Sequence, residues 1–319
     1  MTPRLTIVIP FYRGHAYLRA AIESVIQQST RDWVLHISDD CGSEIGTQEL
    51  VESYRDDRIH YSRNPVRLGI GGNWNRCLEL AETDLVTLLH ADDELRPSYV
   101  EVMTTTAEQN PEAVAVFSAA EIIGPDGQPH FSLADAVKRY LWRQEGKPSI
   151  VAGRRGIEAL CRGNFLMCPT ACYRKSRLGV RRFSDRWQFV LDLELFARLL
   201  FDGGQFVLIP DRIYAYRRHA ENTTEQHTQS LRRFEEEFSI YNHLAEVARK
   251  RVWLLAAHRA DTRLLLRLNL VFRALTDFTH GRLHAASRKV MFLVSPHHTP
   301  SLESRCPLDL DDTAQPVAR

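Results

Sequence analysis

The feature that most constrains the fold is an alternation, early in the chain, between short apolar runs and segments with helical periodicity. Five runs carry the first signal: Leu5–Ile9, Trp33–Ile37, Ile59–Tyr61, Leu85–Leu89 and Ala113–Phe117. Compact runs of this kind are typical of strands that are buried on both faces of a sheet. The segments between them, such as Ala16–Gln28, place apolar residues on one helical face. Short links between the two kinds of segment predict a doubly wound, mostly parallel α/β sheet flanked by helices.

The pattern changes twice along the chain and suggests an organisation into parts. After the turn signal Gly124–Gly127 the periodicity loosens, although Asp192–Phe201 predicts a helix and Gln205–Ile209 and Arg212–Tyr216 predict strands. From about Gln226 the period is helical, over 226–248, 250–278 and 281–294. We therefore expect one domain over 1–224, with halves at about 1–122 and 123–224, a helical appendage over 225–298, and a disordered tail over 299–319.

Composition excludes several classes of partner and compartment. The formal net charge is +1, so no overall field attracts nucleic acid, and we expect no nucleic-acid partner. The six cysteines form no C-x-x-C pair, which favours buried thiols in a reducing compartment. No stretch reaches the ~18 consecutive apolar residues of a spanning helix. We therefore expect a cytoplasmic protein.

Polar side chains follow three of the predicted strands at the point where each strand ends. Pro10-Phe11-Tyr12, Asp39-Asp40 and Asp92-Asp93 all occupy such positions. Ligands of open α/β sheets bind beyond the carboxyl ends of the strands. If these strands are neighbours, their terminal groups converge on one edge of the sheet and form a site.

The pair Asp92-Asp93 is the strongest candidate for metal binding. Two adjacent carboxylates repel each other, and a hard divalent cation such as Mg²⁺ or Mn²⁺ would neutralise them while it also binds phosphate oxygens. A helix-capping pair is the alternative, because Asp93 lies four residues before Pro97. For Asp39-Asp40 the alternatives are recognition of a base or ribose and an Asx-turn that enters the loop at Gly42.

Three segments together resemble the opening of family 2 glycosyltransferases of the GT-A fold. These segments are Leu5-Thr-Ile-Val-Ile-Pro-Phe-Tyr, Ala21-Ile-Glu-Ser-Val-Ile-Gln-Gln-Ser and Ile37-Ser-Asp-Asp-Cys-Gly-Ser. Asn75–Asp93 is similar to the family's N-x-x-x-x-x-A-x-G-x-Y-I-x-x-L-D-x-D-D segment. The resemblance is good over 4–122 and weaker through 219. One departure is an extra residue in the loop after Asp40, relative to the family's D-D-G-S-T-D-G-T.

The resemblance implies roles for residues on the nucleotide side. Pro10 and Tyr12 match positions that contact the base and ribose, and Asp40 matches the acidic residue that recognises the base. Asp92 and Asp93 match the D-x-D-type metal motif, with Asp92 also near the nucleotide and Asp93 expected to be the direct ligand.

The resemblance also implies roles for residues of the second half. Leu191-Asp192-Leu193-Glu194-Leu195 is similar to the family's E-D-W-E-L motif, which makes Asp192 the expected general base toward the acceptor hydroxyl. The alternative for Asp192 is a helix N-terminal charge. Tyr216–Asn222 is similar to the Y-R-x-H-x-x-S/N segment, so Arg217 and His219 are expected near the donor diphosphate.

These matches together predict an enzyme that transfers a hexosyl or related group from a nucleotide-diphosphate sugar. The resemblance implies inversion, a divalent metal, and a saccharide or lipid-linked acceptor, as in polysaccharide biosynthesis. Two other functions remain open: nucleotidyl transfer to a sugar phosphate, and non-catalytic binding of nucleotide sugars. Basic amphipathic segments from Arg249 to Arg273 and from Arg282 to Lys289 either pack on the domain or contact the inner face of a membrane.

Overall fold

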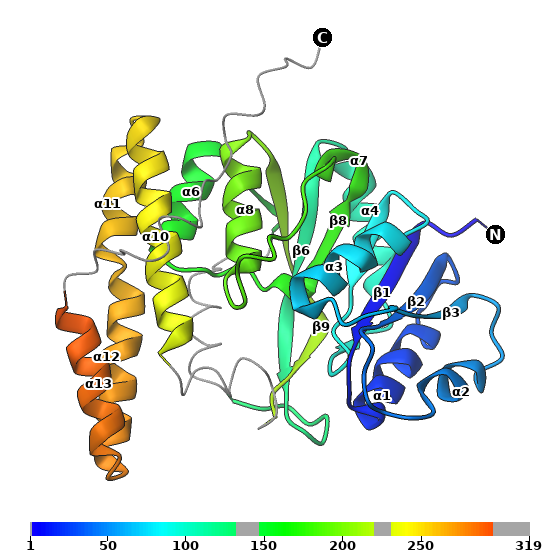
Figure 1. Cartoon of the computed structure of the whole chain (residues 1–319). Coiled ribbons are helices and arrows are strands. Elements are labelled where there is room, and N and C mark those ends of the chain that lie inside the picture. The colour runs from blue at the N-terminus through cyan, green and yellow to red at the C-terminus, as the bar shows by residue number, and fades with distance from the viewer. Residues whose placement is uncertain (1, 132–146, 220–230, 296–319) are drawn as a thin grey trace.

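The computed structural model describes residues 2–131, 147–219 and 231–295, and within these ranges nine strands form a single sheet (Figure 1). The strand order is β3-β2-β1-β4-β8-β6-β9-β5, with β7 beside β9. The strands are β1 (Leu5–Phe11), β2 (Trp33–Asp39), β3 (Ile59–Arg63), β4 (Leu85–Leu88), β5 (Glu94–Leu95), β6 (Ala113–Ile123), β7 (Ser149–Ala152), β8 (Ala171–Arg174) and β9 (Gln205–Arg217).

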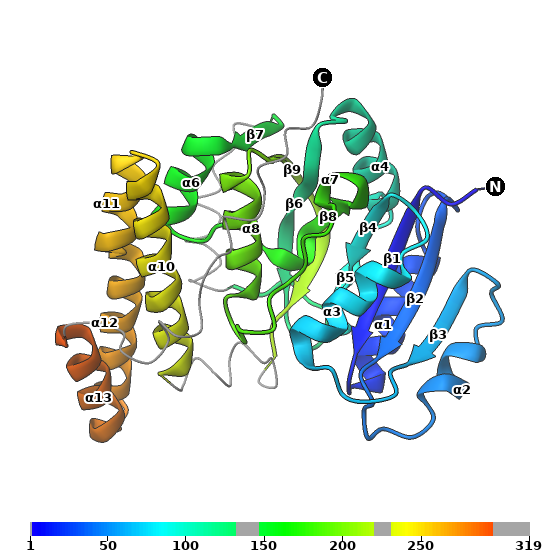
Figure 2. The same cartoon turned by 45° about the horizontal axis from the view of Figure 1, so that its top comes forward.

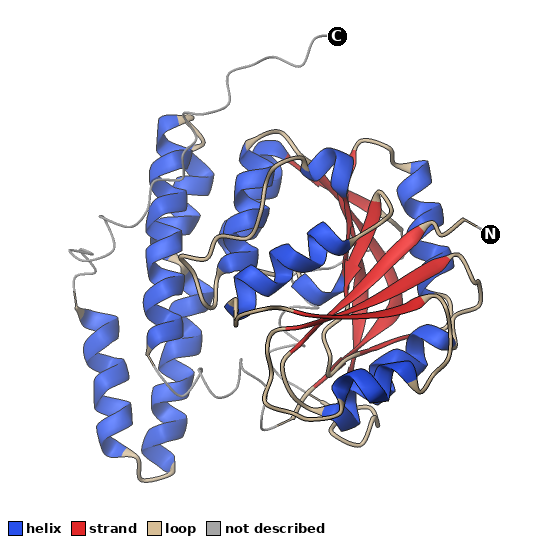
Figure 3. Ribbon diagram, turned by 45° about the vertical axis from the view of Figure 1, so that its right-hand side comes forward, coloured by secondary structure: helices blue, strands red, loops and turns tan. Residues whose placement is uncertain are grey.

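Helices cover both faces of this sheet, as Figure 3 shows. The helices of the first part are α1 (His15–Ile26), α2 (Thr47–Glu52), α3 (Gly69–Leu80) and α4 (Tyr99–Gln109). Those of the second part are α6 (Gly153–Arg162), a 3-10 turn η1 (Cys168–Thr170), α7 (Lys175–Leu178) and α8 (Leu191–Phe201). The last group is α10 (Arg232–Lys250), α11 (Leu254–Thr262), α12 (Leu264–Thr279) and α13 (Leu283–Val294).

The predicted parallel core is confirmed on the β3-β2-β1-β4 side of the sheet. Strand β1 runs parallel to both β2 and β4, and β2 runs parallel to β3. Successive side chains of a strand point to opposite faces, so Ile7 and Ile9 join the core under α1 and α4, whereas Val8 joins the core under α3, α6 and α8. Burial on both faces explains why these strands are apolar runs without alternation.

The second half departs from a parallel sheet. Strand β8 lies antiparallel between β4 and β6, and β9 runs parallel to β6. The two strands predicted over Gln205–Ile209 and Arg212–Tyr216 are one long strand, because a register shift between β6 and β9 accommodates the Pro210-Asp211 interruption. The short strands β5, β7 and β8 are not foreseen by periodicity.

The C-terminal helices form two pairs, α10 with α11 and α12 with α13, on one side of the molecule (Figure 2). The two pairs differ in burial. Helices α10 and α11 contribute to the core shared with α6 and α8. The hairpin α12–α13 extends beyond it and buries few residues. The helical segment predicted over 250–278 consists of two helices, because the chain turns at Val252 and again at Arg263, both with positive φ. No helix in the described ranges is both long and apolar enough to cross a membrane.

Three expectations concern residues outside the described ranges. The expected domain boundary near residue 224 falls within 220–230, and the expected tail 299–319 falls within 296–319. Part of the region after Gly127, in which the periodicity loosens, also lies outside the described ranges, at 132–146. The division into domains stays a prediction.

Candidate active site

The structure brings the ends of β1, β2 and β4 together at one edge of the sheet. Phe11 lies opposite Asp39 in the register of β1 and β2, and the Asp40 amide donates to the Phe11 carbonyl at 2.8 Å. On the other side of β1, the Leu89 amide donates to the Val8 carbonyl at 3.0 Å. The loops that follow the three strands therefore start side by side, as the sequence predicts.

The loop after β2 is fixed by the fully buried carboxylate of Asp39. Its Oδ1 accepts from the Gly42 amide at 2.8 Å and its Oδ2 accepts from the Tyr61 hydroxyl at 2.6 Å. A Cβ at Gly42 would lie 2.1 Å from the Tyr12 carbonyl oxygen, so only glycine fits there. Cys41 takes a left-handed φ of 58°, which lets the longer loop turn back against Tyr12.

Asp40 faces the N-terminus of α3. Its carboxylate accepts from the Leu68 amide at 2.7 Å, the Gly69 amide at 2.9 Å and the Asn64 side chain at 3.2 Å. The free amides at a helix N-terminus stabilise a negative charge there. Three of the roughly four lone-pair positions of an ionised carboxylate are then used within the protein, which leaves about one for a ligand. Asp40 thus organises the loop before α3 whatever else it binds.

Pro10 and Tyr12 stand half-buried beside this loop. The guanidinium of Arg67, an exposed residue, lies 4.3 Å from the centre of the Tyr12 ring. A cation stacked on an aromatic ring at this edge is suited to an anionic, planar ligand. Arg67 carries no motif signal, and sequence reasoning did not identify it.

The two carboxylates after β4 have different environments. Asp93 is 1% exposed, and its two oxygens accept from the Tyr214 hydroxyl and the Arg217 amide, each at 2.8 Å. Burial, reinforced by the neighbouring charge of Asp92, raises the pKa of Asp93 well above its ordinary value, although these two hydrogen bonds act against the rise. Asp93 therefore joins the β4 loop to β9.

Asp92 is the more accessible of the two carboxylates, with 29% of its side chain exposed. Its Oδ2 lies 3.0 Å from Nε2 of His219. Burial acts to raise the pKa of Asp92, but the hydrogen bond with His219 and the charges of His90 and His219 outweigh it and lower the pKa below the ordinary value. An ionised carboxylate thus lies at the edge of the site.

His90 completes a group that sequence reasoning missed. One ligand atom from each of His90, Asp92 and Asp93 lies within 4.8 Å of the other two. The Nε2 atom of His90 is buried and has no hydrogen-bond partner among the described residues, and its ring packs against Trp74 at 5.3 Å. A buried polar atom without a partner is costly, so a cation that His90 could bind would satisfy it. The residues present therefore fit a divalent metal.

The side chains of Arg217 and His219 point in different directions. Arg217 is 3% exposed and donates to the carbonyl oxygens of Asp92 at 2.8 Å and Gly124 at 3.0 Å. It also pairs with Glu94, and its guanidinium lies 5.1 Å from the Tyr17 ring. The guanidinium therefore faces the protein interior and holds the loop that carries Asp92. The imidazole of His219, by contrast, lies beside the carboxylate of Asp92.

Asp192 comes from the second half of the chain, on the side of η1 and β8. It lies in the first turn of α8, where its Oδ1 accepts from the Leu193 amide at 2.7 Å. Burial and then the nearby charge of Asp192 raise the pKa of Cys168, which places Asp192 close to the start of η1. That turn leads into β8, the neighbour of β4. The partial positive charge at a helix N-terminus is favourable for a carboxylate in this place.

The sequence of this chain matches a known protein family. A sequence model described as "Glycosyl transferase family 2" matches residues 6–173, more than half of the 319 residues. The chain belongs to glycosyl transferase family 2. Its class of activity is therefore glycosyl transfer, as the resemblance implied.

Two relatives show the extent of the similarity. The chain is 27% identical over 188 residues to the GalNAc(5)-diNAcBac-PP-undecaprenol beta-1,3-glucosyltransferase of Campylobacter jejuni. The aligned region covers 58% of this chain and 56% of that enzyme. The chain is 25% identical over 242 residues to an uncharacterized protein of Mycobacterium tuberculosis, with 72% of each chain covered. Because the match spans little more than half of the Campylobacter enzyme, its substrates enter below only as proposals.

Solved structures confirm the GT-A fold of this family 2 glycosyltransferase. The crystal structure of S. aureus TarS 1-349 aligns with a TM-score of 0.59 at 16% identity, covering 82% of this chain and 72% of that one. The same protein in complex with UDP aligns with a TM-score of 0.56 at 16% identity, covering 91% and 88%. At this identity the likeness shows the fold alone.

The family's motif shows how His90 could have been identified from the sequence. In Leu89-His90-Ala91-Asp92-Asp93 the histidine stands where the L-D-x-D-D pattern has its first aspartate. A position-by-position comparison with that pattern would have identified it. The roles predicted for Pro10, Tyr12, Asp40, Asp92, Asp93, Asp192, Arg217 and His219 stay predictions.

The hydrogen bond between Tyr214 and Asp93 gives a test of this arrangement. We expect Tyr214→Phe to lower the free energy of unfolding by ~1–3 kcal/mol, because a buried oxygen of Asp93 loses its hydrogen-bond donor. Tyr99→Phe is the matched control, since Tyr99 is equally buried but bonds to the neutral Thr87 hydroxyl at 3.0 Å, and it should cost ~0.5–1.5 kcal/mol. Urea unfolding measures both, and equal losses would contradict the role of Asp93 as the group that anchors the β4 loop to β9.

Proposed function

We propose that this glycosyltransferase moves a sugar, with inversion and with a divalent metal, from a nucleotide-diphosphate sugar to a hydroxyl of a saccharide or lipid-linked saccharide. The observation that carries the proposal is the grouping of His90, Asp92 and Asp93 beyond β4. Asp40 and Tyr12 lie at the end of the adjoining strands, and Asp192 comes from α8. One edge of the sheet thus offers groups for a nucleoside, a diphosphate and an acceptor.

On the nucleotide side, each residue has a defined task in the proposal. Pro10 and Tyr12 contact the base and ribose, and Asp40 uses its remaining lone pair for a donor on the base. Arg67, stacked on Tyr12, supplies positive charge toward the diphosphate. This assignment moves the diphosphate contact from Arg217, whose guanidinium is turned inward, to Arg67 and His219.

The metal, Mg²⁺ or Mn²⁺, would be held by Asp92 with His90. When bound, it would neutralise charge on the diphosphate leaving group. We give Asp92 the direct contact that the sequence motif suggested for Asp93, because both Asp93 oxygens already accept bonds from β9. Asp93 then acts as a positioning residue. His219 orients the carboxylate of Asp92 through the bond at 3.0 Å.

Inversion requires one displacement by the acceptor hydroxyl on the face opposite the leaving group. Asp192 is the proposed general base that takes the proton from that hydroxyl as it attacks. Its place in the first turn of α8 is favourable for a carboxylate and is on a different element from the carboxylates after β4. Nucleotidyl transfer is disfavoured by the family, and non-catalytic binding leaves Asp192 without a task.

Metal removal tests the role of Asp92. The donors are a panel of nucleotide sugars that begins with UDP-GlcNAc. We expect EDTA to weaken donor binding at least about tenfold, because it removes the metal ion between the carboxylate and the diphosphate. Added Mn²⁺ should restore the binding. Asp92→Asn should bind the donor weakly with or without EDTA. Asp211→Asn, an exposed control on β9, should respond like the wild type. A metal response that persists in Asp92→Asn would contradict the assignment.

Substitution of Asp192 tests the catalytic base. We expect Asp192→Asn to lower kcat by about 10²–10⁴-fold with little change in donor affinity, because proton transfer is lost while the nucleotide side is intact. The anomeric configuration of the product, measured by NMR, should be inverted. Asp211→Asn again serves as the control. Retention of configuration, or turnover unaffected in Asp192→Asn, would exclude this mechanism.

The α12–α13 hairpin extends the proposal to the acceptor. Six apolar side chains of α12, each at least 38% exposed, follow one another at helical spacing: Leu264, Leu268, Val271, Phe272, Leu275 and Phe278. We call this set the α12 stripe. Apolar stripes of this size on a protein surface mark interaction sites. The stripe faces away from Leu270 and Ala274, which are buried.

Charge favours an anionic lipid surface as the occupant of this stripe. Residues 251–295 contain eight Arg or Lys and two Asp, so they carry +6 whereas the remaining residues sum to −5. Basic amphipathic helices bind anionic membranes through such an apolar face. The Campylobacter relative is named for an undecaprenol-linked substrate. We therefore propose that the enzyme docks on the cytoplasmic face of a membrane to reach a lipid-linked acceptor.

Vesicle binding tests the docking surface. We expect the protein to co-sediment with phosphatidylglycerol vesicles, and the variant with Leu268→Ser, Phe272→Ser and Leu275→Ser to lose most of that binding. Ile150→Ser with Val180→Ser is the control, because both residues are exposed apolar residues away from α12. Unchanged sedimentation of the α12 variant, or light scattering that shows a dimer abolished by it, would contradict a membrane role.

A further inference from the structure

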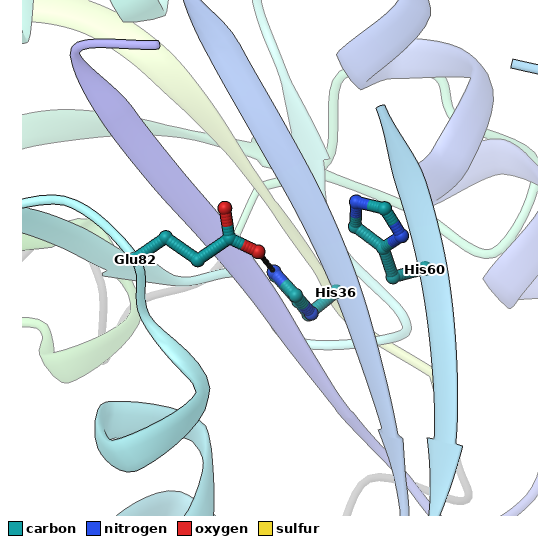
Figure 4. Close-up of side chains that lie close together, drawn as sticks. All are labelled: His36, His60 and Glu82. Atoms are coloured by element: carbon teal, nitrogen blue, oxygen red, sulfur yellow. Dashed lines mark hydrogen bonds and ion pairs between the residues drawn. The ribbon is translucent and has the colours of Figure 1, made fainter. Parts of the chain in front are cut away.

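A second cluster of metal-binding side chains lies away from the β4 loop, on β2, β3 and the segment that follows α3. One ligand atom from each of His36, His60 and Glu82 lies within 4.8 Å of the other two. Figure 4 shows the two imidazoles side by side on adjacent strands, with Glu82 reaching toward His36. Among the described residues, this group and the one at His90 are the two that offer three such ligands.

The sheet itself places the two histidines together. His36 and His60 are direct partners in the parallel register of β2 and β3, so their side chains leave the same face at the same level. Their ring centroids are 4.9 Å apart. The face is the one covered by α3, because Ser38, two residues along β2, bonds to Asn73 of α3 at 2.7 Å. Glu82 follows the end of that helix and meets the pair there.

The electrostatic state of the group suits a cation. Burial and the neighbouring His60 lower the pKa of His36, so its imidazole is neutral near pH 7 and can act as a ligand. Nε2 of His36 and Oε1 of Glu82 are 2.9 Å apart. Ligand atoms of a tetrahedral zinc site, with bonds of ~2.0–2.2 Å, lie about 3.3 Å from one another. The His36–Glu82 spacing is near this value, and His60 and Glu82 are exposed side chains that can adjust.

We propose that His36, His60 and Glu82 form a zinc site that is separate from the catalytic metal. Two imidazoles and one carboxylate are a borderline-soft donor set that favours zinc over magnesium. Three protein ligands leave a fourth position for water. This inference does not depend on the proposed transfer reaction, because none of its three ligands belongs to the active site.

The position of the site gives it a structural consequence. Zinc would link His36 on β2 to His60 on the edge strand β3 and to Glu82, which follows α3. Because His60 and Glu82 lie at the two ends of the segment 59–82, the bound ion would hold both ends of that segment. That segment also contains Asn64, Leu68 and Gly69, the three donors to Asp40. A clamp there restrains the loop on which the proposed nucleoside contact depends. We expect zinc to raise the thermal midpoint and to slow amide hydrogen exchange in β3.

The experiment titrates the whole purified chain with zinc against a chromophoric chelator. We expect His60→Ala and Glu82→Gln each to weaken zinc binding at least about tenfold, since loss of even an outer-shell partner costs about 10–100-fold. Both residues are exposed, so neither variant should disturb folding. His284→Ala, an exposed histidine on α13, is the matched control and should bind as the wild type does.

A second arm separates this site from the active site. Asp92→Asn should keep the zinc-dependent rise in thermal midpoint, and His60→Ala should lose it while it keeps the Mn²⁺-dependent donor binding. Zinc held by His60→Ala and Glu82→Gln as tightly as by the wild type would overturn the proposal. So would a thermal response that disappears only in Asp92→Asn.

Discussion

The buried carboxylate of Asp93 is the interaction on which the geometry of the site depends. A buried carboxyl group is costly unless hydrogen-bond donors surround it. Here the donors are the Tyr214 hydroxyl and the Arg217 amide, which belong to a strand more than 120 residues further along the chain. The loop after β4 is thus fixed to β9 before any ligand binds. Arg217 extends the junction, because its guanidinium also bonds to the Gly124 carbonyl in the turn after β6.

The parts of the fold that could be predicted are those in which local sequence and global burial agree. Strands β1, β2 and β4 are buried on both faces, so their apolar runs are visible without tertiary information. Strand β8 is only four residues, Ala-Cys-Tyr-Arg, and it exists because β4 and β6 bond to it on either side. The break at Arg263 has no glycine or proline to announce it, and the buried guanidinium bonds there to the Ala260 carbonyl.

For the site, the sequence located the groups but not the directions of their side chains. Strand alternation says that Tyr214 and Arg217 point to opposite faces, yet it cannot say which face is covered. The structure buries Arg217 through three carbonyl contacts, a direction that its motif does not indicate. The same limit applies to Asp92 and Asp93, adjacent carboxylates that only the position of β9 distinguishes. His90 was recoverable from the motif, whereas Arg67 depends on a contact between two loops.

The burial and hydrogen bonding of each polar group distinguish the residues that support the loops from those that are available to a ligand. Asp39, Asp93 and Arg217 are buried and hydrogen-bonded to the segments around them, so all three stabilise the loops of the site. Asp92 remains partly exposed, and His90 keeps a buried nitrogen for which the described residues offer no partner. Buried polar atoms are almost always satisfied in folded proteins. The orphan nitrogen belongs to His90, which is grouped with Asp92 and Asp93, and it is therefore the polar atom that a bound cation would satisfy.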